Sequence, residues 1–459
     1  MNMTGLSFDA LPDIRLPFGF FLAATLFGVI SALVIMTNAE HVWLSRWQGE
    51  VLALTHAFGL GVITLIMLGA LLQMLPVVGG ASFPYVKVVA ITSLLAISGG
   101  LILLLAHFIW PHLFSALFPQ ILLFFGFLVY LSALVVALMS SKARGPTVRG
   151  IRLSACSFSL VILLGLLLLA VRQSPPSVLG LNSDAIIIFA NKSFTDIHAI
   201  IASFGWVSLL IIAVSYQVVP MFHVAPSFPK KLALVLPVTL FSLVCLAFPV
   251  YLNVGLFNMS VETLASALIL CIVALLVFYG VVIVSLLRKR KRQVPDITIN
   301  FWFLAITVLT VVFILLIASQ LDDVLNEKFS ANLALSMHKM PLLLAALFFY
   351  GFVFSIIQGL LVKILPFLSY THLQNLCLAN FNCMQFLPHM HQLLPKQHAK
   401  ILFVIHVCGL VCLAFSPYFL VACYLFSIIL LIQFLWLQKL IANCYLLYKA
   451  TRQKIQQQT

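Results

Sequence analysis

Twelve apolar runs divide this chain, and each is long enough to cross the hydrocarbon core of a bilayer. A crossing helix needs about 20 residues, because a helix rises about 1.5 Å per residue and the core is about 30 Å thick. Lipid leaves backbone polar groups no partner outside the segment, and no alternating strand pattern is present. The sequence predicts an all-α polytopic membrane protein with helices near residues 14–37, 51–78, 85–109, 113–140, 151–171, 195–222, 231–254, 261–287, 297–319, 338–369, 399–416 and 418–448.

Composition supports the same fold class. Hydrophobic residues make up 63% of the 459 residues and charged residues only 8%. A water-soluble globule of this size needs far more polar surface. We therefore expect residues 1–459 to form a single membrane domain.

A short pattern occurs three times along the chain. Gly61, Gly205 and Gly351 each open an apolar run that has a polar residue twelve positions later and a proline three positions beyond that. The glycines are 144 and 146 residues apart, and a fixed period is the signature of repeated structural units. The pattern predicts three pseudo-repeats of four helices, near 14–140, 151–287 and 297–448, with the motif on the second, sixth and tenth helices.

Basic residues gather in alternate loops, which sets the expected orientation. The other loops contain acidic residues such as Glu40 and Asp184. Because cytoplasmic loops are rich in Lys and Arg, both termini are predicted to be cytoplasmic. The net charge of +14 then reflects topology and contact with anionic lipid, and gives no reason to expect a nucleic-acid partner. The basic set comprises Lys142, Arg144, Arg149, Arg152, Lys230, Lys231, Arg288, Lys289, Arg290, Lys291, Arg292, Lys449, Arg452 and Lys454.

Three histidines lie on or at the mouth of the motif-bearing helices. His56, His198 and His338 precede their glycines by 5, 7 and 13 residues. An imidazole inside a bilayer is costly, so each is a candidate cofactor ligand in the outer half of the membrane. The unequal offsets place them on different helix faces, so they are not strict symmetry mates. The structural alternative is a ring that bonds a backbone carbonyl, and His406 resembles a lone core histidine.

The helix count and the motif resemble subunit I of the haem–copper oxidase superfamily, which includes the nitric oxide reductases. The segment HAFGLGVITLIMLGALLQMLP, from His56 to Pro76, is similar to the haem-bearing helices of the nitric oxide reductase branch. The segment GFVFSIIQGLLVKILPFLS, from Gly351, is similar to the later part of the tenth oxidase helix. The resemblance implies b-type haem held by His56, with His198 or His338 as the second ligand. It also implies a haem pocket lined by aromatic side chains, namely Phe58, Phe204, Trp206 and Phe349.

Several family residues are missing from this chain. The tenth helix has Leu343 and Ala345 where the family has histidines, and the seventh helix has no copper-binding histidine pair. A complete haem–copper centre cannot be assembled, so neither oxygen reduction of the usual type nor copper binding is predicted. The chain resembles the degenerate, NnrS-like proteins of this architecture. That resemblance implies electron transfer or the handling of nitric oxide or oxygen, an electron-transfer partner, and the bacterial inner (cytoplasmic) membrane.

The predicted cytoplasmic loop 370–398 contains a second set of candidate metal ligands. Cys377, Cys383, His389 and His391 offer thiolate and imidazole ligands. Their spacing fits no tight ligand template, and the Leu, Phe and Met residues of the loop equally suit an interfacial amphipathic segment. Both interpretations remain open from the sequence.

The polar residues of the motif are Gln73, Gln217 and Lys363, each just before a helix-ending or kinking proline. Structural bonds to freed backbone groups are expected; the alternative is the entrance of a proton or ion path. At the level of function, a haem-free membrane carrier or scaffold with a central cavity is the alternative to haem binding. Its glycines and prolines would be packing and kink features.

Overall fold

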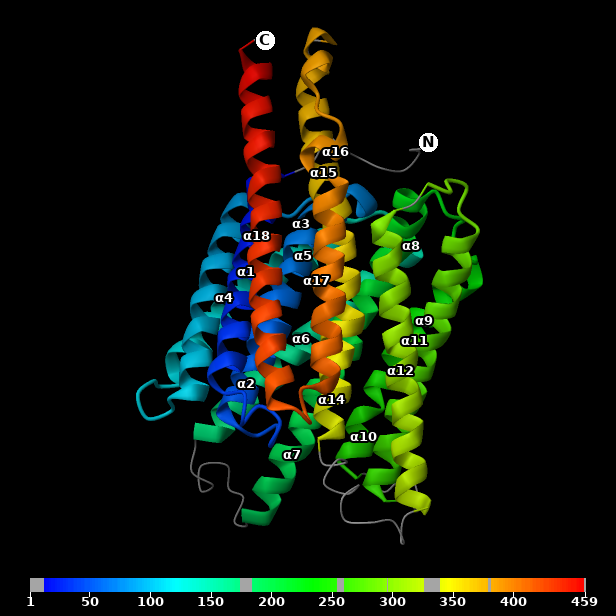
Figure 1. Ribbon diagram of the computed structural model, residues 1–459. Helices are drawn as coiled ribbons and strands as arrows, with labels where there is room; N and C mark the ends of the chain where they lie inside the picture. The colour runs from blue at the N-terminus through cyan, green and yellow to red at the C-terminus, as the bar shows by residue number, and fades with distance from the viewer. Residues whose placement is uncertain are drawn as a thin grey trace.

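The computed structural model describes residues 12–173, 184–253, 260–294, 296–325, 339–378 and 381–457, and all regular structure within them is helical. Twelve of these helices are long and apolar enough to cross a membrane. The prediction of an all-α polytopic membrane protein is therefore confirmed. The helices stand side by side in one bundle (Figure 1).

The elements fall into three successive groups of four spans. The first group is α1 (Arg15–Thr37), then α2 (Gly49–His56), η1 (Ala57–Thr64) and α3 (Leu65–Gly79) as one span, α4 (Val86–Ile109) and α5 (Leu117–Ser140). The second is α6 (Pro146–Gln173), then α7 (Asp184–Ile200), η3 (Ile201–Ser208) and α8 (Leu209–His223), α9 (Lys230–Cys245) with α10 (Ala247–Tyr251), and α11 (Val261–Arg288). The third is α12 (Ile297–Leu325), then α14 (Met340–Ala346), η4 (Leu347–Phe354) and α15 (Ser355–Cys377), α17 (Lys396–Phe415) and α18 (Leu420–Gln456).

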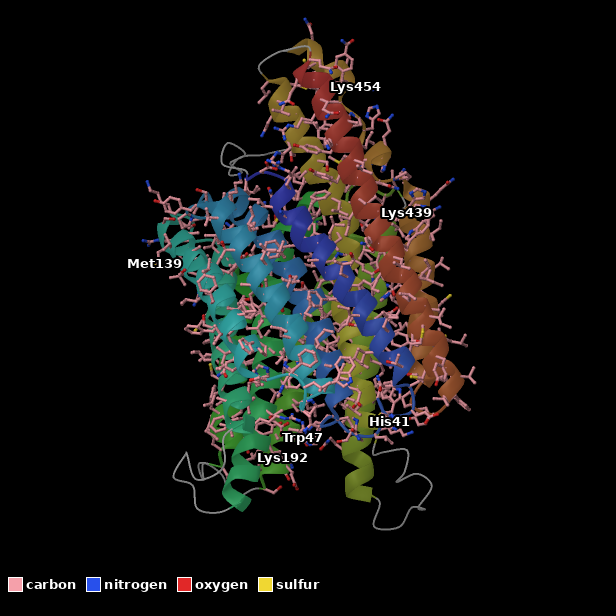
Figure 2. All side chains as sticks on the ribbon, turned by 90° about the vertical axis from the view of Figure 1, so that its left-hand side faces the viewer. His41, Trp47, Met139, Lys192, Lys439 and Lys454 are labelled. Carbon is pink, nitrogen blue, oxygen red and sulfur yellow. The ribbon has the colours of Figure 1, made fainter. Side chains whose placement is uncertain are left out.

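Two helices run well past the predicted membrane boundary. The α15 helix continues to Cys377 and α18 to Gln456, and both project beyond the rest of the bundle (Figure 1). The predicted loop 370–398 therefore starts later than expected and contains the short helices η5 (Phe381–Phe386) and α16 (Met390–Leu393). We call the end where α18 finishes the terminal side and the opposite end the far side. Lys454 lies at the terminal side, whereas His41, Trp47 and Lys192 lie at the far side (Figure 2).

The bundle closes on itself. The first helix packs against the last, α5 packs against α6, and α11 packs against α12, so each group contacts the next around a ring. The rings of Phe18 on α1 and Tyr445 on α18, for example, lie 5.8 Å apart between centroids. The second, sixth and tenth spans are more buried than any other span except the first, which matches the second. These three spans therefore form the centre of the bundle.

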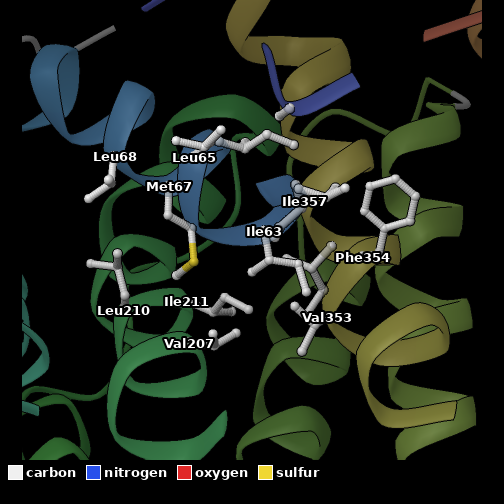
Figure 3. Packing of buried hydrophobic residues seen from close by; sticks show 14 of the residues in the cluster. Ile63, Leu65, Met67, Leu68, Val207, Leu210, Ile211, Val353, Phe354 and Ile357 are labelled. Carbon is white, nitrogen blue, oxygen red and sulfur yellow. The ribbon is translucent and has the colours of Figure 1, made fainter. Parts of the chain in front are cut away.

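Apolar side chains fill the middle of this centre. Figure 3 shows Ile63 from the second span, Ile211 from the sixth and Val353 from the tenth turned toward one another, with further apolar neighbours. Each of the three is at most 5% exposed. Interiors packed in this way leave few voids larger than a water molecule. These side chains form an apolar plug at mid-bundle, and the two cavities described below lie toward its two ends.

Each central span contains a π-helical segment at the same register. The segments η1, η3 and η4 are each eight residues long and run from four residues before the motif glycine to three residues after it. The hydroxyls of Thr64 and Ser208 donate to carbonyls five residues earlier, at Gly59 (3.0 Å) and Ser203 (2.8 Å). π-Helical segments are rare in proteins, and those that occur often lie at functional sites. The shared register supports the predicted pseudo-repeats.

The motif glycines share a packing role as well. A Cβ on Gly61 would lie 2.5 Å from the Phe27 ring, on Gly205 2.8 Å from the Ser157 hydroxyl, and on Gly351 2.6 Å from a Val308 methyl. All three partners lie on the first helix of the same group, namely α1, α6 and α12. Each glycine therefore allows the second span of its group to approach the first span closely.

Candidate functional site

Two of the three predicted histidines come together toward the far side of the bundle. His56 ends α2 and His198 lies two residues before the end of α7, so both stand just before a π-helical segment. Their ring centroids are 6.5 Å apart and the ring planes differ by 21°. His338, the third candidate, lies outside the described residues.

Each ring of this pair keeps one nitrogen available. His56 Nδ1 lies 2.8 Å from the Leu52 carbonyl oxygen, which can only accept, so Nδ1 carries the proton and Nε2 carries the lone pair. His198 interacts with the backbone of Val161, and its buried Nδ1 has no hydrogen-bond partner among the described residues. A carbonyl that fixes one nitrogen while the other stays free is the usual arrangement of a metal-ligating histidine.

Close packing fixes the positions of the two rings. The Phe108 ring lies 5.2 Å from the His56 ring between centroids. A Cβ on Gly165 would lie only 3.1 Å from His198 Cε1, so the glycine leaves space for that ring. Near the surface, Arg46 pairs with Asp196, two residues before His198. This ion pair joins α7 to the loop that follows α1.

A cavity of about 160 Å³ lies close by on the far side, between the second and tenth spans. It is lined mostly by apolar side chains and by the ring of Tyr350, and Phe58 and Phe349 contribute to its wall. Ala345 also lines it. Neither His56 nor His198 does so. The histidine pair and the far-side cavity are therefore neighbouring but separate features.

The other two aromatic side chains expected to line a haem pocket make different contacts. Phe204 packs edge-on against Phe348, with ring centroids 5.2 Å apart. Trp206 stacks on Phe158 at 4.1 Å and donates from its indole nitrogen to Thr64 at 3.1 Å. Trp206 thus fastens the sixth span to the fifth and second spans, away from the far-side cavity.

His406 is not a lone core histidine. Its Nε2 lies 2.6 Å from the Ser355 hydroxyl oxygen, and that hydroxyl already donates to the Gly351 carbonyl at 2.6 Å. The ring therefore donates from Nε2 to Ser355, and Nδ1 is the acceptor. His406 and Ser355 are fully buried. His406, on α17, is therefore hydrogen-bonded to the tenth span through Ser355, which directly follows η4.

Two glutamines and a tyrosine complete this polar network. The amide nitrogens of Gln358 and Gln433 lie 3.1 and 2.9 Å from His406 Nδ1, and Gln433 also donates to Gln358 Oε1 at 2.9 Å. The Tyr350 hydroxyl donates to Gln433 Oε1 at 2.6 Å. The network joins the tenth, eleventh and twelfth spans. Sequence reasoning missed it, although an amide within an apolar span, as in Gln358 and Gln433, was an available signal.

The four residues considered for a metal in the loop after the tenth span do not converge on one site. Cys377 and Cys383 are buried, whereas His389 and His391 are exposed. The backbone N–H of His389 donates to the Gln392 side chain on α16 at 2.8 Å, and the Cys383 thiol faces the Ile455 carbonyl at 3.9 Å. Among the described residues, no group of three or more His, Cys, Asp or Glu side chains could hold a metal.

The polar residues of the repeated motif make structural contacts. The Gln73 amide donates to the Pro12 carbonyl at 3.1 Å, just before α1. Lys363 forms an ion pair with Asp296, just before α12. Both side chains thus join the second span of a group to the start of its first span, close to the structural role expected from the sequence. Gln217 is half-buried.

A second and larger cavity surrounds the ion pair on the terminal side. It has a volume of about 800 Å³ and lies between the ends of α8 and α15, the segment that precedes α12, and the start of α17. Basic, aromatic and aliphatic side chains line it together. We call it the terminal-side cavity.

Comparison of the chain with known protein families and with curated proteins found no match. The twelve-span helical membrane fold, the histidine pair, the buried network and the two cavities therefore carry the functional argument.

Proposed function

We propose that this protein binds a b-type haem on its far side through His56 and His198, and that it serves electron transfer or the handling of nitric oxide or oxygen. The resemblance of its motif and helix count to oxidase subunit I suggested the cofactor. The observation that carries the proposal is the pair of imidazoles, 6.5 Å apart between centroids, each with an uncommitted nitrogen.

His56 and His198 would be the residues that hold the haem iron. Metal–imidazole bonds are about 2.0 Å long, so two rings that share one metal lie about 6 Å apart between centroids. The spacing of His56 and His198 is close to this value. The far-side cavity alone, at about 160 Å³, is smaller than ordinary ligand pockets of about 300 Å³ or more. A porphyrin therefore requires side chains around the pair to move apart.

The surrounding residues prepare the two ligands. The Leu52 carbonyl holds the His56 ring in the tautomer that leaves Nε2 free, and the Phe108 ring packs beside the His56 ring. When bound, haem would supply one-electron exchange and a site for a diatomic gas.

From the basic loops we infer that the terminal side faces the cytoplasm. The histidine pair would then lie toward the opposite surface of the membrane. In a bacterium the membrane is the inner (cytoplasmic) membrane. An electron donor would approach from the far side, where His56 and His198 lie nearest to the surface. The proposal includes no copper centre.

The test is the visible spectrum of the detergent-purified protein, oxidised and dithionite-reduced, together with a pyridine haemochrome assay. We expect a reduced α-band of b type in the wild type and its loss in His56→Ala and in His198→Ala. His41→Ala is the matched control, since His41 is an exposed histidine of the same side. A colourless wild type after expression with ample haem, or a band that survives both substitutions, rules the proposal out.

One observation favours the alternative of a haem-free carrier or scaffold. The terminal-side cavity, at about 800 Å³, is of the size that binds small molecules, and charged side chains line it. The apolar plug at mid-bundle separates it from the far side, so transport needs a second conformation. A purified wild-type protein without a haem spectrum favours this alternative over haem binding.

A further inference from the structure

We propose that the terminal-side cavity binds an amphiphile through a phosphate group. This inference does not depend on haem. It rests on the basic side chains that line the cavity and on one buried histidine nitrogen that has no hydrogen-bond partner among the described residues. It also rests on a carboxylate of the protein that pairs with one of the basic side chains, and on the apolar part of the cavity wall.

The positive charge of the cavity is far in excess of its negative charge. Five basic side chains line it, and Asp296 is the one carboxylate among its lining residues. They converge from three parts of the chain, for Arg290 and Arg292 follow α11, Lys363 is on α15, and Lys396 and Lys400 begin α17. Cations collected from separate elements around one concave space create a positive field that attracts an anion.

His223 adds a donor that the fold itself does not use. It ends α8, lines the terminal-side cavity and is only 4% exposed, yet its Nδ1 has no hydrogen-bond partner among the described residues. A buried polar atom without a partner is rare and calls for an explanation. An anionic oxygen in the cavity would accept from this nitrogen.

Asp296 already acts as an internal counter-ion. It pairs with Lys363, and it accepts from the Thr298 backbone at 3.1 Å and from the Thr298 hydroxyl at 2.9 Å. Burial raises the pKa of Asp296, but the bonds from Lys363 and Thr298 outweigh it and hold the pKa below its ordinary value. The carboxylate is therefore charged at neutral pH and competes with an incoming anion for Lys363.

Part of the cavity wall is apolar. Phe222 and Phe367 meet edge-on there, with ring centroids 5.4 Å apart, and Leu394 contributes an aliphatic surface. Such a wall suits a hydrocarbon or other apolar body next to the charged group. A ligand with both parts matches the cavity better than a small hydrated ion does.

The number of cations indicates phosphate. A phosphate group has several oxygens that accept charge-assisted hydrogen bonds, and both Arg and Lys are established partners for it. Two sources share this chemistry: the headgroup of an anionic phospholipid, and a soluble organic phosphate. The experiment below distinguishes them.

Binding is measured with the full chain purified in dodecyl maltoside. Isothermal titration calorimetry uses two probes separately: sodium phosphate, and mixed micelles that contain phosphatidylglycerol, with phosphatidylcholine micelles as the blank. Lys363→Gln removes one cavity cation, and Lys231→Gln is the matched control because Lys231 is an exposed lysine of the same side that does not line the cavity. Asp296→Asn removes the competing carboxylate.

We expect Lys363→Gln to weaken binding about tenfold, which corresponds to one charge-assisted hydrogen bond. Asp296→Asn should tighten binding several-fold, and Lys231→Gln should change it less than twofold. Should Lys363→Gln fail to fold, Arg292→Gln tests the same point, because Arg292 is exposed and lines the same cavity.

The two probes identify the source of the phosphate. Saturable binding of phosphatidylglycerol with none of sodium phosphate supports a lipid headgroup. The reverse supports a soluble phosphate and overturns the amphiphile. An absence of binding for both probes overturns the proposal. So does an equal loss in Lys363→Gln and Lys231→Gln, which would mean attraction to the basic surface in general.

Discussion

Both ring nitrogens of His406 are engaged by neighbouring helices, whereas His56 and His198 each keep one nitrogen free. This difference separates a structural histidine from candidate ligands at the scale of single residues. A satisfied buried network fixes one arrangement of the helices around it, because every alternative leaves a polar group without a partner. The free nitrogens, in contrast, are unexplained by the fold.

The first prediction at this scale concerns Gln433. Replacing it with Leu in Gln433→Leu keeps the approximate volume but removes the partner of the Tyr350 hydroxyl and one donor to His406 Nδ1. A buried polar group left without a partner costs about 1–3 kcal/mol. We expect a destabilisation of about 2–3 kcal/mol, measured as a lower thermal unfolding midpoint in detergent.

Gln438→Leu is the control for this measurement. Gln438 lies on the same helix and is half-buried, so its substitution should change stability by about 0.5 kcal/mol or less. Equal effects of the two variants would show that the network contributes nothing specific to stability.

The π-helical segments are the feature that matters most at the scale of elements. Each brings a motif glycine against the first helix of its own group. The segments η1 and η3 also follow directly on α2 and α7, the helices that hold His56 and His198. A π-helical turn contains more residues than an α-helical turn, so it changes the direction in which the preceding side chains point. The three π-helical segments thus determine the directions in which side chains point at the far-side ends of the second, sixth and tenth spans.

A pair of substitutions within η1 tests this packing. Gly61→Ala places a Cβ 2.5 Å from the Phe27 ring and 3.0 Å from Leu101, whereas a Cβ on Gly59 meets nothing within 4 Å. We expect Gly61→Ala to destabilise the protein by about 1–3 kcal/mol through overpacking. Gly59→Ala should be neutral or stabilising by up to about 1 kcal/mol, because alanine favours helix. Thermal unfolding of both variants decides, and equal behaviour contradicts the packing argument.

Hydropathy predicted which segments cross the membrane better than it predicted where each helix ends or which turns are π-helical. All twelve spans were expected, because a run of apolar residues has no other stable arrangement in lipid. The extension of α18 to Gln456 was not, since the helix continues through a polar tail that hydropathy reads as loop. Nor were η1, η3 and η4 expected, because the side chains of a π-helical turn are no different in kind from those of an α-helix.

The candidate site was predictable only in part. His56 and His198 were identified from their rarity within apolar spans, and the structure brings them together. The partners of His406 were missed because Gln358 and Gln433 lie 48 and 27 residues away from His406 along the chain. Contacts of that range depend on how helices are arranged around the ring, which one sequence does not specify.

At the scale of the whole molecule, the two ends of the bundle differ in character. The far-side cavity is mainly apolar, while the terminal-side cavity is lined by five basic residues, and an apolar plug lies between them. The three groups close into a ring in which α1 packs against α18. The apolar plug lies between the proposed haem site and the proposed phosphate site, so either proposal can hold without the other.

The distribution of charge across the bundle also predicts its orientation. The five consecutive basic residues from Arg288 to Arg292 and the basic end of α18 all lie on the terminal side. Moving such segments across a membrane is unfavourable, which is the origin of the positive-inside rule. In bacterial cells, we expect green fluorescent protein fused after Thr459 to fluoresce, and alkaline phosphatase fused there to be inactive. A chain truncated after Trp47, on the far side, and fused to alkaline phosphatase should be active. The reverse pattern would place the histidine pair on the cytoplasmic side, so electrons would have to come from a cytoplasmic donor and the phosphate site would face the outside.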